Sequence, residues 1–222
     1  MGVCCGEEEV VAMRSRPMVL TVLALSLMVG GCTSETELDT PPSMTDGSRT
    51  SGSAASESNE PPTGKVEGAL WQALMSPDGE YASSASYAAV IARHGEVEPY
   101  VTIRAAEERH IAALTRQLQR LGVEVPDNPW TGQVEAPEEL RQAAADWAEG
   151  EVANVALYDR LLDDVSSDRA AVRVFTNLRR ASLEAHLPLF EGAAQGDGTL
   201  TAEKMVALGH APGTDGRGPA WG

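Results

Sequence analysis

Apolar residues along this chain form one continuous run near the start and several stripes at helical spacing further on. The clearest stripe lies in residues 100–121, YVTIRAAEERHIAALTRQLQRL. Its large apolar members recur every three or four residues, which is the period of a helix with one buried face. They are Tyr100, Ile103, Ile111, Leu114, Leu118 and Leu121.

Three more segments share this period and predict helices over residues 77–93, 137–162 and 168–190, after a short apolar segment at 66–75. Gly95 is expected to end the first, and Pro188 to kink the last, because proline cannot donate to the Glu184 carbonyl. No strand pattern accompanies them. Short connections between helices favour antiparallel neighbours, so the prediction is an all-α, antiparallel four-helix bundle over residues 65–195.

The segments on either side of this bundle have a different composition. Residues 33–64 are rich in Ser, Thr, Pro, Gly and Glu and are nearly free of apolar side chains. Such a segment cannot bury enough surface to fold and is expected to be a disordered tether. Residues 196–222 form a Gly-rich tail, in which residues 201–208 suggest one short helix.

The continuous apolar run belongs to an N-terminal export signal. Arg14 and Arg16 precede an apolar stretch at residues 19–29, which is too short to span a membrane comfortably. The tetrapeptide VGGC at residues 29–32 resembles a lipobox, which implies cleavage before Cys32 and lipidation of its thiol. An ordinary secretory signal with an incidental cysteine is the alternative. The lipobox interpretation makes residues 1–32 the signal and places the mature protein on the outer face of a bacterial membrane, held by a lipid anchor.

Residues 1–12 include three consecutive glutamates where such a signal should be basic, so translation is predicted to start at Met13. Cys4 and Cys5 then fall outside the protein, and lipidation of Cys32 leaves no free thiol. The core must therefore stabilise the fold without disulfides.

Composition narrows the function. The 222 residues carry a formal net charge of −16, and a surface this acidic argues against nucleic acid as a partner. Aromatic residues make up only 5% of the chain, which agrees with helices rather than a sheet. Neither a Gly-x-Ser-x-Gly motif nor a phosphate-binding loop is present, so nothing points to a hydrolase.

Two ionisable residues interrupt the stripe at residues 100–121, since Glu107 and His110 fall between Ile103 and Ile111 on the same face. An ionised carboxylate buried without a partner is very unfavourable. Residues three apart on a helix point to the same side. A Glu-x-x-His pair is how one helix of a four-helix bundle supplies ligands to a di-metal carboxylate centre.

The other predicted helices carry similar residues on their inner faces. The candidate metal ligands are Glu80, Glu107, His110, Glu151 and His186. A full centre would also have a glutamate three residues before His186, but that residue is Leu183, and Glu184 points away from His186. Carboxylate and imidazole donors suit iron or manganese. The expected function is therefore metal oxidation or the handling of oxygen or peroxide at a candidate dinuclear site.

Each ligand also has a simpler explanation. Glu107 and His110 could hydrogen-bond each other or a core tyrosine, and Glu80 could stabilise a helix N-terminus. Glu151 could pair with an inward-facing arginine. These roles would make the protein a metal-free helical binding or structural module of the cell envelope.

The same holds for the remaining polar residues of the inner faces. His186 could be a buried histidine that bonds Ser182 one turn earlier. Tyr87 and Tyr158 are expected to be core residues rather than redox-active ones. The occurrence of ionisable residues on four helices favours the metal-binding hypothesis over these explanations.

At these residues the chain resembles the bacterial ferritin-like domain of unknown function of the 2202 type. The resemblance rests on Glu80, on AEERH at residues 106–110, on the region of Glu151 and Asn154, and on NLRRASLEAHLPLF at residues 177–190. It implies a ferritin-like bundle in which the five candidate ligands face the metal, and it implies no particular reaction. Leu183 and Asn154 depart from the full ligand pattern. The protein partner stays open, and a homodimer is compatible with the sequence.

Overall fold

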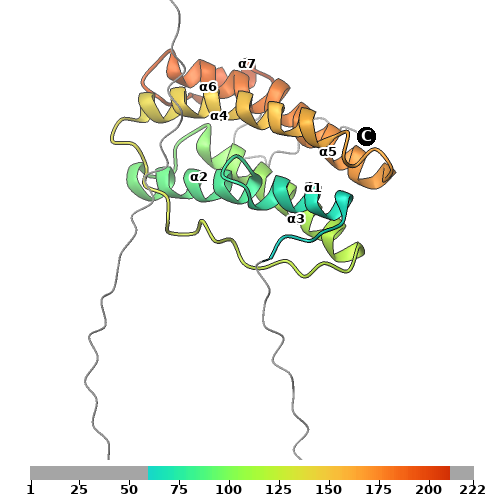
Figure 1. The fold of residues 1–222 in the computed structure, drawn as a ribbon. Coiled ribbons are helices and arrows are strands. Elements are labelled where there is room, and N and C mark those ends of the chain that lie inside the picture. Colours follow the sequence, from blue (N-terminus) through green and yellow to red (C-terminus); the bar gives the residue numbers. More distant parts are fainter. Residues whose placement is uncertain (1–59, 211–222) are drawn as a thin grey trace, which may run out of the picture.

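The computed structural model describes residues 60–210 (Figure 1). The predicted signal with its lipidation site Cys32 lies outside the described residues, as do the tether up to residue 59 and the tail from residue 211. Every regular element between residues 60 and 210 is helical, which confirms the all-α prediction for this part of the chain.

Two layers of helices are visible in Figure 1, with α1, α2 and α3 in one and α4, α5, α6 and α7 in the other. Packing within the layers is closest between α2 and α3 and between α4 and α6. In chain order the elements are α1 (Lys65–Met75), α2 (Glu80–His94), α3 (Tyr100–Arg120), α4 (Leu140–Leu161), α5 (Arg169–Ala181), the π-helical turn η1 (Ser182–His186), α6 (Leu187–Ala194) and α7 (Ala202–Ala207).

The apolar segment at 66–75 is itself helical and forms most of α1. A tight turn at residues 76–79 joins it to α2. The helix predicted from residue 77 begins at Glu80 instead. Gly79 makes the turn possible, because a Cβ there would lie 2.5 Å from the Ala73 carbonyl oxygen. The turn places Glu80 in the first turn of α2 with its side chain 1% exposed.

The helix ends agree with their sequence signals. Gly95 ends α2 with φ of 85°, and its N–H donates to the Ile91 carbonyl at 2.9 Å. Asp168 caps α5 by accepting from the N–H groups of Ala170 at 2.9 Å and Ala171 at 3.0 Å. These caps fix where α2 stops and where the last long helical segment starts.

The helix predicted over residues 168–190 forms as α5, η1 and α6 in succession. Instead of a simple kink, Pro188 follows a π-helical turn, in which the Leu187 N–H donates to the Ser182 carbonyl five residues back. Proline has no N–H to close an α-helical bond to Glu184, so the wider turn relieves the mismatch. This turn carries His186.

The buried apolar residues form two separate clusters along the helices. One cluster includes Leu74, Leu114, Leu118, Leu157, Tyr158, Phe175 and Leu178. The other includes Tyr87, Tyr100, Ile103, Ala144, Trp147, Leu189 and Phe190. Between the parts that enter the two clusters lie Glu107 on α3, Glu151 and Asn154 on α4, and Ser182 and His186 on the α5–η1–α6 segment. The core is thus divided by a polar layer.

The second cluster also takes in residues beyond the predicted end of the bundle at 195. Leu200 is 6% exposed, and Met205 of the short predicted helix, now α7, is fully buried. Folded structure therefore extends past residue 195, because α7 covers one end of the second cluster.

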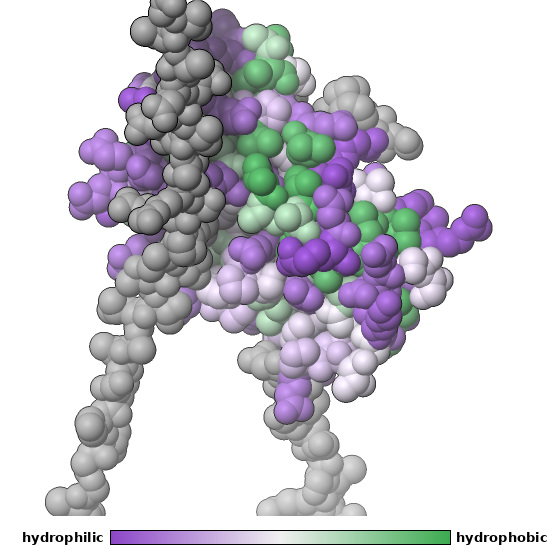
Figure 2. Space-filling view, turned by 45° about the horizontal axis from the view of Figure 1, so that its top comes forward, coloured by the Kyte–Doolittle hydropathy of each residue, from purple (hydrophilic) through white to green (hydrophobic). Residues whose placement is uncertain are grey.

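The surface is mixed in character, and Figure 2 shows hydrophilic side chains around smaller hydrophobic groups on one face. The large hydrophobic residues that are exposed within residues 60–210 are Val152, Leu183, Val206 and Leu208. In this part of the chain no helix combines the length and the apolar character needed to cross a membrane.

Candidate metal centre

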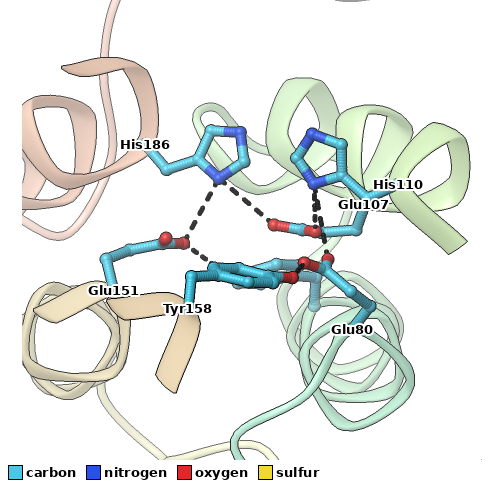
Figure 3. A network of polar contacts seen from close by, with 7 residues as sticks. Glu80, Glu107, His110, Glu151, Tyr158 and His186 are labelled. Atoms are coloured by element: carbon cyan, nitrogen blue, oxygen red, sulfur yellow. Dashed lines mark hydrogen bonds and ion pairs between the residues drawn. The ribbon is translucent and has the colours of Figure 1, made fainter. Parts of the chain in front are cut away.

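The five ligand candidates lie together in the polar layer between the two apolar clusters. Figure 3 shows the carboxylates and imidazoles converging from α2, α3, α4 and η1. Helical spacing explains only why Glu107 and His110 share a face, whereas the other three side chains reach the same place through packing of their helices.

The ligand atoms fall into two groups that could each hold a metal ion. The first group consists of Glu80, Glu107 and His110, and the second of Glu107, Glu151 and His186. Within each group the donor atoms lie within 4.8 Å of one another. Each group therefore combines one carboxylate of its own, one imidazole and the shared carboxylate of Glu107.

Glu107 connects the groups by directing one oxygen to each histidine. His110 Nδ1 donates to Glu107 Oε2 at 2.9 Å, and His186 Nδ1 lies 3.2 Å from Glu107 Oε1. The two imidazole rings lie side by side at a centroid separation of 5.6 Å (Figure 3). A carboxylate that divides its oxygens in this way is suited to bridging two ions.

The other two carboxylates complete the ionic contacts. Glu80 Oε2 lies 3.4 Å from His110 Nδ1, and Glu151 Oε1 lies 3.4 Å from His186 Nδ1. His186 therefore faces two carboxylates, and Glu151 pairs with a histidine.

Burial at this layer is nearly complete. Glu80, Glu107 and Glu151 are each at most 2% exposed, and only the His110 side chain, at 15%, reaches solvent to any extent. Glu80 Oε2, Glu151 Oε2 and His186 Nδ1 are buried without a hydrogen-bond partner. Buried polar atoms are seldom left without one. Their identity as carboxylate oxygens and an imidazole nitrogen fits a metal ion as that partner.

Electrostatics separate the two carboxylates of the first group. Burial, together with the neighbouring charge of Glu107, raises the pKa of Glu80 to about 8. Burial alone would raise the pKa of Glu107 too, but the charge of His110 and the hydrogen bonds with Glu80, His110 and His186 together outweigh it and hold this pKa well below its usual range. Glu107 is thus the ionised partner and Glu80 the protonated one near neutral pH.

The histidines are shifted in the opposite sense to a simple buried imidazole. Burial lowers the pKa of His110, yet Glu107 and Glu80 outweigh it and raise the pKa to about 9. In His186, Glu151 and Glu107 likewise overcome burial and raise the pKa to about 10. Without metal, both histidines are therefore in the positively charged imidazolium form at neutral pH.

Two tyrosines hold the outer carboxylates in a reciprocal arrangement. Tyr87 on α2 donates to Glu151 Oε1 on α4 at 2.9 Å, and Tyr158 on α4 donates to Glu80 Oε1 on α2. Both rings are fully buried. Burial, followed by the adjacent carboxylate of Glu151 or Glu80, raises the pKa of each hydroxyl well above its usual value. Each tyrosine fixes one carboxylate oxygen and leaves Oε2 directed elsewhere.

Sequence reasoning assigned these tyrosines to the core and missed their polar role. A signal was present, because Glu80 and Tyr87 are seven residues apart, as are Glu151 and Tyr158. Seven residues make two helical turns, so each pair shares a face. The repeated spacing identifies α2 and α4 as equivalent contributors to the layer.

We expect Tyr87→Phe to destabilise the metal-free protein more than Tyr100→Phe. Tyr87 bonds a buried carboxylate, and such bonds contribute about 1.5–3 kcal/mol. Tyr100 is equally buried, but its hydroxyl donates to the neutral Leu140 carbonyl at 3.1 Å, where about 1 kcal/mol is expected. Urea unfolding of both variants provides the comparison. Equal losses would show that Tyr87 acts as an ordinary core tyrosine.

The π-helical turn changes the interpretation of Leu183. The sequence pattern places the missing glutamate ligand three residues before His186, at the position of Leu183. In the structure, however, Leu183 is 40% exposed. Ser182 is the buried residue instead, at 2% exposure, because the π turn contains an extra residue relative to an α-helical turn. Glu184 is exposed, as predicted. A glutamate at 183 would therefore not face the centre in this backbone.

Comparisons with protein-family models, with curated proteins and with solved structures found no match for this chain. The interpretation of the centre consequently rests on the donor atoms, their burial and their distances.

Proposed function

We propose that this chain is a dinuclear metal-binding protein of the ferritin-like kind. The observation that carries the proposal is the carboxylate of Glu107, which is shared between two buried Glu/His groups. A single ion would need only one of these groups. Glu80 and Glu151 each have a carboxylate oxygen without a hydrogen-bond partner. These oxygens support one metal-ion position on each side of Glu107.

The proposed architecture is an antiparallel four-helix bundle. In this arrangement α3 and α4 each fill one place, α5 with η1 and α6 fills a third, and α1 with α2 fills the fourth. Contacts of both α1 and α2 with α3 support the pairing of these two shorter helices in one place. Each of the four places then contributes at least one residue to the polar layer.

Iron and manganese are the proposed ions, because carboxylate and imidazole donors suit both. Bound iron or manganese would supply one-electron redox chemistry, such as metal oxidation or the handling of oxygen or peroxide. The protein residues would hold the ions through Glu80, Glu107, His110, Glu151 and His186. Tyr87 and Tyr158 would orient the outer carboxylates, and the apolar clusters on both sides would limit access of water.

We further propose that the protein is an exported lipoprotein. Support comes from the sequence of residues 13–32, with Cys32 as the lipidated residue, and from the polar composition of residues 33–64. The anchor would hold the helical domain on the outer face of the bacterial membrane, with the tether as a spacer.

A metal-free module is the second candidate, and one observation favours it. Without metal, both protonated histidines face the ionised carboxylate of Glu107, so the layer compensates part of its own charge. Such a network could serve only to fix the packing of the helices.

Metal analysis distinguishes the two functions. The full chain, produced with added iron or manganese, is expected to contain two ions per molecule, whereas a Glu107→Ala, His110→Ala double variant should contain none. Elemental analysis of the purified proteins gives the ratio. A metal-free parent that still unfolds cooperatively would reject the metal-binding proposal and favour the structural network.

A further inference from the structure

The two Glu/His groups contain fewer negative charges than two divalent ions require. Glu80, Glu107 and Glu151 supply three carboxylates, and the two histidines bind as neutral imidazoles. Two divalent ions bring four positive charges, which leaves one in excess. An uncompensated charge in a buried site is strongly unfavourable, so the loaded centre requires one more anion.

The described residues offer no fourth carboxylate for this role. Apart from the three glutamates and His186, the buried polar residues within 60–210 are neutral. They are Ser83, Ser86, Thr102, Asn154 and Ser182. Tyr87 and Tyr158 already donate to Glu151 and Glu80, so their hydroxyls are engaged as donors.

The place for an outside anion is the η1 side of the centre. Glutamates come to the layer from α2, α3 and α4, but η1 contributes only His186 to the two groups. The other buried residue of η1 is Ser182, whose side chain carries no charge. Leu183 faces solvent. His110, the one ligand with some exposure, stacks on His186 of η1 (Figure 3). The ligand that reaches solvent therefore lies beside the same turn.

We propose that the metal-loaded centre binds one small monocarboxylate, such as acetate, on the η1 side, where it replaces the missing glutamate. This inference rests on the proposed function, because it assigns a ligand to the dinuclear site. A small carboxylate matches the donor class already present and supplies the one negative charge that the chain lacks.

The test uses the full chain loaded with cobalt(II), whose visible spectrum reports its ligands. Titration with sodium acetate is expected to give a saturable spectral change at one acetate per two cobalt ions, and sodium chloride at equal ionic strength should give none. Two bound cobalt ions without an acetate response would overturn the inference and leave the proposed function intact. A chain that binds no cobalt would overturn the proposed function itself.

A pair of aspartate variants locates the site. Ser182→Asp adds a carboxylate on the buried face of η1 and is expected to abolish the acetate response while two cobalt ions are retained. Leu183→Asp adds the same group one residue later on the exposed face, and it should respond to acetate as the parent does. An unchanged response in Ser182→Asp would contradict the placement. If that variant fails to fold, the titration of the parent still decides whether the anion binds.

Discussion

Glu107→Gln is expected to remove both metal ions at once, whereas Glu80→Gln or Glu151→Gln should each remove one. Glu107 is the single carboxylate common to both groups, and its two oxygens face different histidines. Glutamine keeps the size of the side chain but carries no negative charge for either ion. Elemental analysis should therefore give two ions for the parent, none for Glu107→Gln and one for each outer variant.

Glu108→Gln provides a matched control for this series. Glu108 is the next residue on α3, its side chain is 57% exposed, and its contact is an ion pair with Arg104. The same substitution there should leave both ions in place. One ion retained by Glu107→Gln would mean that the two groups bind independently and that Glu107 does not bridge them.

Loading of the centre near pH 7 is expected to release about three protons per chain. Glu80, His110 and His186 have pKa values of about 8, 9 and 10, so all three hold a proton before metal binds. A metal ligand must give up its proton, and metal affinity consequently rises with pH. Titration calorimetry in buffers of different ionisation enthalpy measures the number released.

Glu80→Gln tests the assignment of one of these protons. Because the glutamine cannot titrate, the ion that still binds to the second group should displace about one proton, the one held by His186. Proton release below one per chain in the parent would show that the histidines are already neutral in the metal-free protein.

The same pKa changes predict how pH affects the stability of the metal-free protein. Glu80, His110 and His186 all bind protons more tightly in the folded state, so stability is lost as pH rises above the ordinary values of 4.5 and 6.5 toward 8, 9 and 10. A pKa that differs by one between the folded and unfolded states corresponds to about 1.4 kcal/mol. Glu107, whose pKa is lowered, acts oppositely and only below its ordinary pKa of 4.5. The free energy of unfolding in urea should thus fall between about pH 6 and about pH 9.

The sequence predicted the helices well because their signals are local. The stripe at residues 100–121, the Gly95 end of α2 and the Asp168 cap of α5 all depend on residues within a few positions of one another. The start of α2 was predicted less accurately. The turn before it requires glycine at position 79, because the backbone there passes close to the Ala73 carbonyl of α1. That contact exists only when the two helices are already packed.

The five ligand candidates could also be named from the sequence, because ionisable residues on a core-facing stripe are unfavourable without partners. The contacts among these residues and their neighbours could not be predicted in the same way. Tyr87 reaches Glu151 and Tyr158 reaches Glu80 across the space between α2 and α4. Helical period specifies the face on which a residue lies, but it does not specify which residue of another helix it meets.

The sequence by itself therefore determined the helical class of the described residues and the five ionisable candidates on the inner faces, because both follow from side-chain period and polarity along one helix. Tertiary structure alone decided that Glu107 is shared by two groups and that Ser182, not Leu183, is buried beside His186. The physical reason is that these features depend on distances between helices and on the π-helical hydrogen bond from Leu187 to Ser182. Packing of the two apolar clusters on either side of the polar layer sets those distances.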